Sequence, residues 1–504
     1  MLRQPRGLTA SPPLPYTLEV AREQVEFLPH QPATEGLPRK AMTGSRITAD
    51  SELANGIMGG GDRLETKMTQ LADDSIGGAT LRKVVWRLIP FLGLLYFFAF
   101  LDRVNVGFAA LTMNADLGIS AAAYGIGSGI FFLGYILCEV PSNVMLERLG
   151  ARIWIARIMI SWGVLSAAMA FVQGPRSFYA VRFLLGIAEA GFFPGIIFYL
   201  TCWFPAQHRA RIIALFMIAL PLSSVIGAPI STSLLGIEAA GLRGWQWMFL
   251  LEAIPTIVLG IAVLAVLPDR PADAKWLSED EKRWLQGELA REHSGAAHDH
   301  ASSLREALTL PRVWRNGLVY FCILVGLYGF GFWLPQIIAS LGGLTHLQVG
   351  LVTMIPYSLA CIALVLWGRH SDATEERSLH VALPMLMGAA ALTLSGWTGA
   401  PVIAFAALCL AAVGIYSGLP SFWALASRGL QGAAAAGAIA LINSLGNFGG
   451  FLGPAAIGFA KTYTNSYAAS LLFIAVFLAL GAVLVLWERA REQRVETPHL
   501  TSRV

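Results

Sequence analysis

The stretch VVWRLIPFLGLLYFFAFLDRVNVGFAAL, residues 84–111, decides the fold. An α-helix needs about 20 mostly apolar residues to cross the hydrocarbon core of a bilayer, and this stretch is long enough to do so. It nevertheless contains an ionisable pair, Asp102 and Arg103. A lone charge inside a bilayer costs roughly 2.5–3.5 kcal/mol, so we expect both side chains to be paired and functional.

A second apolar stretch, AVRFLLGIAEAGFFPG at residues 180–195, holds Arg182 and Glu189. Seven helical residues return to within about 20° of the same face, about 10.5 Å further along the axis. Both side chains can therefore line one cavity at different depths, but they cannot bond to each other, so each needs another partner. The adjacent pair of the first stretch points about 100° apart, and Asn105 lies near its acidic member.

Two interpretations of the four charges remain open. They could lock helices together, or Asp102 and Arg103, late in the first span and near its outer end, could extend to the membrane surface. They could instead bind a solute. A guanidinium binds a carboxylate through a two-pronged fork, and a carboxyl group in a low-dielectric cavity can load and release a proton.

Composition places the chain in the membrane. Of its 504 residues, 55% are hydrophobic and 13% charged, whereas soluble domains carry about 25% charged residues. The net charge of +4 does not indicate nucleic-acid binding, and the five cysteines form no CxxC pair. Because no nucleophile motif, P-loop or metal-ligand spacing occurs, we expect no enzymatic activity, cofactor or metal.

The ends of the chain differ from its middle. Residues 1–80 combine prolines, scattered charges and a run of three glycines, which predicts a disordered extension. No apolar segment follows the basic start, so this is not a secretory signal. Met68 precedes the first span and is an alternative start. Residues 488–504 are expected to form a cytoplasmic tail.

The pattern of apolar stretches predicts an all-α integral membrane protein, because β-barrel strands would be shorter and alternating. We expect twelve spans, at residues 84–108, 121–146, 153–172, 177–204, 211–236, 247–267, 313–339, 347–368, 379–397, 401–427, 432–459 and 465–487.

Basic residues gather on one side of these spans, which predicts that both termini are cytoplasmic. That side carries Arg82, Lys83, Arg87, Arg148, Arg152, Arg209, Arg211, Lys275, Lys282, Arg283, Arg291, Arg305, Arg369, Arg377, Arg428, Arg489, Arg491 and Arg494. The opposite side carries only Arg176, Arg243 and Lys461.

The longest connection, residues 268–312, separates two predicted six-helix bundles, 82–267 and 313–487. Within it, Ser278 and Glu281 form a capping box that opens an amphipathic helix, which we expect to lie along the inner membrane surface. Three histidines follow this helix, at positions 293, 298 and 300, and indicate a solvated loop better than a metal site.

The two halves carry similar motifs at corresponding positions. ERLGAR at 147–152 and GRHSDATEER at 368–377 occupy matching connections, and GAP at 227–229 matches GP at 453–454. Repeated halves with Gly/Pro-interrupted helices at matching places are typical of transporters with a site between the repeats.

Four motifs, in order, resemble the major facilitator superfamily and within it the anion:cation symporters, a group of tartrate, phthalate, hydroxyphenylacetate and sugar-acid permeases. They are LDRVNVGFAAL (101–111), EVPSN (139–143) followed by ERLGAR, RFLLGIAEAGFFPG (182–195) and GRHSDATEER. The resemblance covers residues 82–490. The chain departs from the family's loop motif at Glu147, where the family has Asp, and at Ala151, which replaces a basic residue.

The resemblance implies roles for the charged residues. Asp102 and Glu189 would couple protons, and Arg103 and Arg182 would bind the substrate anion. Gate contacts would come from the loop motifs and the adjoining EVPSN, through Glu139, Glu147, Arg148, Gly150, Arg152, Asp372 and Arg377. Pairing of Glu139 with a loop arginine is an alternative.

Neutral side chains in the spans are further substrate candidates, although aromatic packing or helix-to-helix hydrogen bonding explains them as well. Tyr416 and Trp423 are seven residues apart and would share a face of one span. The full set is Asn105, Tyr135, Tyr320, Tyr328, Tyr416, Trp423, Asn443 and Asn447.

These observations predict a monomeric, proton-coupled importer of a small organic anion in a bacterial-type inner membrane. Its partners would be the substrate, protons and the lipid bilayer, with no nucleic acid. A tartrate-like dicarboxylate, a sugar acid or an aromatic carboxylate would suit two arginines. Efflux of drugs or metabolites by proton coupling is the alternative, and a membrane sensor that binds solute without moving it is a third.

Overall fold

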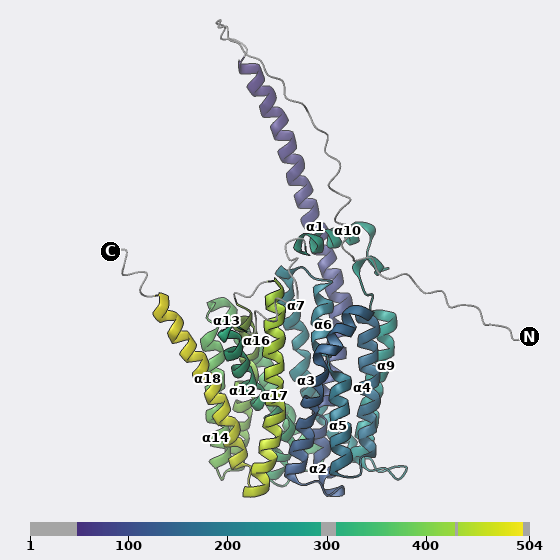
Figure 1. Ribbon diagram of the computed structural model, residues 1–504, viewed down its shortest axis with the longest axis vertical. Helices are drawn as coiled ribbons and strands as arrows, with labels where there is room; N and C mark the ends of the chain where they lie inside the picture. The colour runs from purple at the N-terminus through teal and green to yellow at the C-terminus, as the bar shows by residue number, and fades with distance from the viewer. Residues whose placement is uncertain (1–47, 294–308, 429–431, 497–504) are drawn as a thin grey trace, which may run out of the picture. The chain divides into compact units, whose positions relative to one another are not determined.

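The computed structural model describes residues 48–293, 309–428 and 432–496, which are helical apart from short connections and one isolated bridge between Ala239 and Leu242 (Figure 1). The chain divides into two compact units, residues 1–70 and 71–504. In the first unit the described residues, 48–70, belong to helix α1 (Thr48–Val104).

The first half of the second unit contains the end of α1 and the helices α2 (Val106–Asp116), α3 (Ala121–Leu149), α4 (Ala151–Ala168), α5 (Pro175–Glu189), α6 (Phe192–Thr201), α7 (Ala206–Met217), α8 (Ala219–Leu234) and α9 (Gly244–Val266). The short 3-10 helices η1 (Met169–Phe171) and η2 (Pro271–Asp273) follow α4 and α9.

The second half contains α12 (Pro311–Ser340), α13 (His346–Thr374), α14 (Ser378–Trp397), α15 (Pro401–Ser417), α16 (Leu419–Ser427), α17 (Gly432–Thr464) and α18 (Ala468–Glu496). Among the described residues, 11 helical stretches are long and apolar enough to cross a membrane. They match eleven of the predicted spans, and the remaining one, 432–459, lies within α17.

Part of the predicted disordered extension differs from the prediction, because residues 48–80 are helical, while residues 1–47 lie outside the described residues. Strong helix formers such as Leu64, Glu65, Lys67, Met68 and Gln70 favour this conformation. Helix α1 therefore begins well before residue 84, the predicted start of the first span.

Several predicted spans consist of two helices each. The first is divided at Asn105, and the fourth is divided after Glu189. Gly191 takes a left-handed φ of 85°, and a side chain there would collide with Ser142. Interrupted helices place backbone and side-chain polar groups in a membrane interior, where solutes can be bound.

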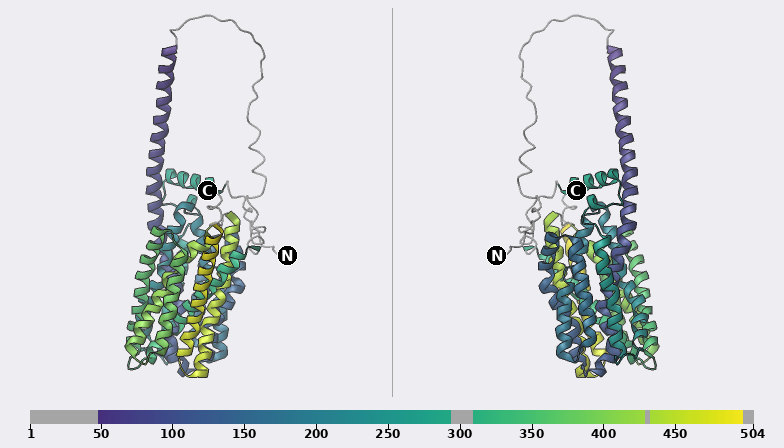
Figure 2. Two further views of the ribbon diagram at one scale, coloured as in Figure 1. Left: turned by 90° about the vertical axis from the view of Figure 1, so that its left-hand side faces the viewer. Right: turned by 90° about the vertical axis from the view of Figure 1, so that its right-hand side faces the viewer.

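We call the end of the bundle at which α3 ends the linker end, and the opposite end, at which α2 ends and α3 begins, the far end. The two halves meet along α3 and α17, α8 and α13, and α2 and α12 (Figures 1 and 2). Glycines allow this close approach: a Cβ on Gly129 would lie 2.6 Å from the carbonyl oxygen of Phe451.

The linker contains α10 (Glu279–His293), which lies across the linker end (Figure 2). Its capping box forms as predicted, because the Ser278 N–H donates to Glu281 and the Glu281 N–H donates to the Ser278 hydroxyl. The apolar side of this segment packs on protein, with Leu285 fully buried and Trp276 stacked on Trp203 at 5.7 Å. The bundle itself therefore buries the apolar stripe, and the position of this helix along the membrane surface stays a prediction.

Candidate functional site

The interior of the bundle holds an ion pair between Arg103 and Glu189. Glu189 is fully buried and Arg103 is 8% exposed. A second nitrogen of Arg103 donates a hydrogen bond of 2.8 Å to the hydroxyl of Tyr328, on α12 in the other half. Arg103 therefore joins the two halves of the molecule through one guanidinium group.

The position of Arg103 and Asp102 differs from the prediction. The span that contains them continues through α2 to Asp116, so they lie in its interior rather than near its end. Asp102 is only 1% exposed. Extension of these side chains to the membrane surface is therefore excluded.

Arg182 is buried without an acidic partner among the described residues. Its guanidinium donates to the backbone carbonyls of Gly127 at 3.3 Å and Ser128 at 3.0 Å. It also lies 5.0 Å from the centre of the Phe131 ring, and the guanidinium of Arg103 lies 5.3 Å from the same centre. Both guanidinium groups thus lie close to the same aromatic ring.

Asp102 does not pair with an arginine in the described structure. One of its oxygens accepts a hydrogen bond of 2.8 Å from the Thr256 hydroxyl, and the other has no partner among the described residues. Asn105 donates to Glu252 at 3.0 Å. The side chains of Asp102 and Asn105 are thus held by α9 rather than by the arginines.

Glu252 is the interior residue that the sequence analysis missed. It is 4% exposed and lies on α9, within the predicted span 247–267. The signal was present, because Glu252 is the only ionisable residue between positions 247 and 267. The rule applied to Asp102 and Glu189 therefore selects it too.

Glu139 bonds to side chains of the other half rather than to a loop arginine. The alternative prediction, that it pairs with a loop arginine, is therefore wrong. It accepts hydrogen bonds from Asn443 at 2.6 Å and from Ser444 at 3.2 Å, both on α17. It lies within α3, one turn after Tyr135, rather than in a loop. Asn447, one turn further along α17, is also buried.

The candidate aromatic residues fall into separate groups. The ring centre of Tyr135 lies 5.7 Å from the Arg103 guanidinium, and the Tyr328 hydroxyl accepts a hydrogen bond from the same guanidinium. Tyr320 contacts Trp423 at 4.9 Å between ring centres, whereas Tyr416 contacts Tyr357.

Contrary to the prediction, Tyr416 and Trp423 do not share a face of one helix, because they lie on different helices. Their span is divided into α15 and α16 at Gly418. The 100° rule applies only along an uninterrupted helix.

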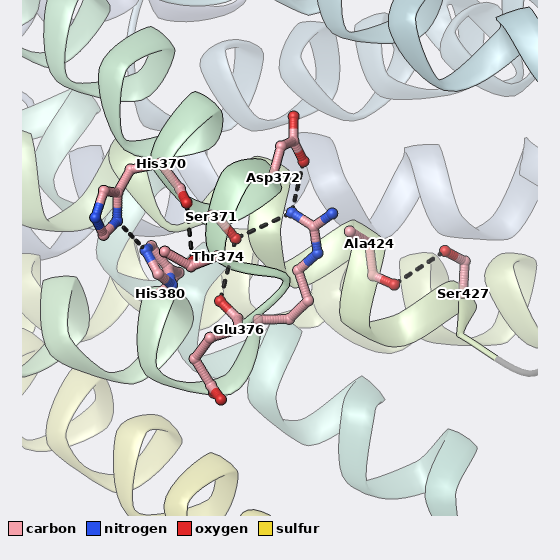
Figure 3. A network of polar contacts seen from close by, with 9 residues as sticks. His370, Ser371, Asp372, Thr374, Glu376, His380, Ala424 and Ser427 are labelled. Carbon is pink, nitrogen blue, oxygen red and sulfur yellow. Dashed lines mark hydrogen bonds and ion pairs between the residues drawn. The ribbon is translucent and has the colours of Figure 1, made fainter.

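The loop-motif residues lie at the linker end. Arg377 donates to Asp372 at 2.6 Å and to Ser371 at 3.0 Å, beside a contact of 2.7 Å between ring nitrogens of His370 and His380 (Figure 3). These contacts hold the end of α13 against the start of α14.

The matching loop of the first half is held differently. The backbone N–H of Arg152 donates to Asp269 at 2.9 Å, and Gly150 has a φ of 88°. Glu147 and Arg148 are exposed. These loop residues are separate from the buried pair of Arg103 and Glu189.

Comparison with known proteins agrees with this architecture. The model of the Major Facilitator Superfamily matches residues 92–454. A protein of Agrobacterium vitis named "Putative tartrate transporter" is 51% identical over 422 residues, which are 83% of this chain and 93% of that protein. The quinolone resistance transporter of Acinetobacter baumannii is 42% identical over 423 residues, which are 83% of this chain and 98% of that protein.

A solved structure shares the fold. The crystal structure of a bacterial homologue of the human lysosomal transporter Spinster, in an inward-facing and unoccupied conformation, matches with a TM-score of 0.64 at 17% identity, over 81% of this chain and 96% of that one. With the family match and the identities above, the chain belongs to the Major Facilitator Superfamily and is a multi-span membrane transporter.

Proposed function

We propose that this transporter imports a small organic anion together with a proton by alternating access. The observation that carries the proposal is the buried contact of Arg103 with both Glu189 and Tyr328, which ties a carboxyl group of one half to a hydroxyl of the other. A guanidinium group that bonds to a carboxyl group of its own half and to a hydroxyl of the other half can couple proton binding to the relative movement of the halves.

The proposed cycle follows from the hydrogen-bonding needs of the guanidinium. When Glu189 takes up a proton, its carboxyl group loses its charge and its attraction for Arg103. Arg103 then needs another anion, and a substrate carboxylate fits its planar fork. When the proton leaves at the other side, the pair of Arg103 and Glu189 forms again and expels the substrate.

The presence of two buried arginines favours a substrate with two acidic or hydroxylated ends. Arg103 and Arg182 flank Phe131, and the bonds of Arg182 go to neutral backbone carbonyls, so its charge is not neutralised by an acid in the described structure. A tartrate-like dicarboxylate meets this arrangement best, and the name of the Agrobacterium vitis relative points the same way.

Uptake into proteoliposomes tests the proposal. Purified protein would be given labelled tartrate, a sugar acid and an aromatic acid in turn, under an imposed pH gradient, an imposed sodium gradient or neither. We expect concentrative uptake of at least one acid that depends on the pH gradient alone. Flux that ignores both gradients would defeat symport, and saturable binding without flux would identify a sensor.

Efflux is the second candidate, because a relative 42% identical is named as a quinolone resistance transporter. The same proteoliposomes distinguish import from export. An exporter coupled to protons by antiport would lose a quinolone from preloaded vesicles when protons are supplied outside, whereas the proposed importer would retain it.

The proposal includes an inner-membrane location, a monomeric state and cytoplasmic termini, which place the linker end in the cytoplasm. Cysteine substitutions test this orientation. A cysteine at exposed Glu279, on α10, should be labelled by an impermeant maleimide only in inverted vesicles, and one at exposed Gly241 only in cells whose outer membrane has been opened. The reverse pattern would contradict the orientation.

A further inference from the structure

A second set of buried polar side chains lies beside the arginine site, and no cation among the described residues is paired with it. Glu252 accepts hydrogen bonds from the Ser231 hydroxyl at 2.5 Å and from the Asn105 amide at 3.0 Å. Asp102 accepts one from Thr256, which is one turn beyond Glu252 on α9. All these donors are neutral, so neither carboxyl group has a compensating positive charge in the described structure.

The described elements packed against α9 place no buried, unpaired cation beside these two carboxyl groups either. These elements are α4, η1, α8 and α2, together with α1, whose Asp102 bonds to Thr256 of α9. In η1 and α8 no residue is ionisable, and Asp116 at the end of α2 bonds to Trp245 and Arg243. The two arginines of α4, at positions 152 and 157, are exposed. Arg103, next to Asp102, is paired with Glu189.

Burial of an ionised carboxylate without a cation is strongly unfavourable, even when neutral groups donate to it. Two such carboxylates close together cost more, because like charges repel. The least costly remedy is a proton. A hydrogen-bond acceptor for the protonated carboxyl group is also present. The side-chain oxygen of Asn105 is buried, and it has no partner among the described residues.

We propose that Glu252 is a second proton-binding site, distinct from the pair of Arg103 and Glu189. When ionised, Glu252 accepts from the Asn105 amide nitrogen, as in the structure. When protonated, it donates to the oxygen of Asn105 after the amide turns over. Asn105 lies between α1 and α2, two residues from Arg103. The turn of its amide therefore links the protonation of Glu252 to the conformation of the chain beside Arg103.

Infrared difference spectroscopy of the purified full-length protein tests this directly, without transport. A pH titration would follow the carbonyl band of protonated carboxyl groups in the wild type, in Glu252→Gln, in Glu189→Gln and in the double variant. Glu279→Gln, on the exposed face of α10, is the control. We expect Glu252→Gln to remove one titrating band, and to remove it equally in the Glu189→Gln background.

Two results would overturn the proposal. One is an unchanged set of bands in Glu252→Gln. The other is displacement of the Glu252 band by sodium at constant pH, which would make this a metal-cation site. If Glu252→Gln fails to fold, Ser231→Ala serves instead, since its hydroxyl donates to Glu252 and its loss should displace the midpoint of that band only.

A transport measurement extends the test and rests on the proposed proton symport. The reversal potential of uptake in proteoliposomes gives the number of protons moved with each substrate. We expect this number to fall by one in Glu252→Gln, with uptake retained. An unchanged ratio beside a lost infrared band would mean that the site binds a proton without carrying it. Absence of any proton coupling in the wild type would defeat the proposed function and leave the infrared result standing.

Discussion

At the scale of single residues, the site depends on what each arginine contacts. Arg103 is neutralised by Glu189, whereas Arg182 bonds to two backbone carbonyls. The sequence identified both arginines, because a charge in an apolar span stands out. It did not identify their partners, because contacts between residues 86 or 225 positions apart leave no trace in local spacing.

Replacement of Glu189 by Gln should weaken the coupling of uptake to the proton gradient. The amide keeps the size of the side chain but cannot lose a proton, so Arg103 stays available on both sides of the membrane. We expect exchange of substrate across the membrane to persist while pH-driven accumulation falls, because one coupled proton is lost. Counterflow and pH-jump uptake in proteoliposomes measure the two activities, and undiminished pH-driven accumulation would show that Glu189 does not couple a proton.

Replacement of Arg182 by Lys should weaken substrate binding while keeping the charge. An ammonium group cannot reproduce the two-pronged fork or its contact with the Phe131 ring. We expect the KM for uptake to rise about tenfold, which corresponds to roughly 1.4 kcal/mol. Arg283→Lys on the exposed side of α10 is the matched control, and equal KM values in both variants would exclude Arg182 from the site.

At the scale of elements, interruptions of the helices decide which residues meet. The sequence predicted the spans well, because about 20 apolar residues in a row are a strong signal. Face assignments failed where a span is divided, as for Tyr416 and Trp423 on either side of Gly418. Interruptions depend on close contacts from other helices, such as that of Ser142 with Gly191, which a single sequence does not display.

Replacement of Gly191 by Ala should therefore destabilise the region that holds Glu189. The left-handed backbone costs an ordinary residue roughly 1–2 kcal/mol, and the new methyl group would also collide with Ser142. Gly118→Ala is the control, because Gly118 has a φ of 61° but open space around it. Thermal unfolding in detergent should show a larger fall in Tm for Gly191→Ala, and equal falls would mean that the contact with Ser142 is unimportant.

At the scale of the whole molecule, the halves are closed against each other at the far end by backbone contacts that only glycine permits. Gly125 and Gly129 on α3 face Pro454 and Phe451 on α17. The sequence predicted two halves with matching Gly/Pro positions, among them the GP pair that includes Pro454. It did not predict that this pair contacts α3, because helix pairing between halves depends on their three-dimensional arrangement.

Replacement of Gly125 by Leu should block closure of the far end, since a side chain there would overlap the carbonyl of Pro454. We expect folded protein with little transport, whose interior becomes accessible from the far end to an impermeant maleimide at a cysteine placed at Tyr328. Gly93→Leu, at a position with open space, should transport normally. Normal transport in Gly125→Leu would show that far-end closure does not require this contact.

The central claim is that a proton on Glu189 frees Arg103 for the substrate. The most direct test counts the protons taken up by purified protein, in weakly buffered detergent, when the acid selected by the uptake panel is added. The account predicts proton uptake by the wild type and by Glu279→Gln, and one proton fewer by Glu189→Gln, although that variant still binds the acid. Equal proton uptake by Glu189→Gln and the wild type would contradict it.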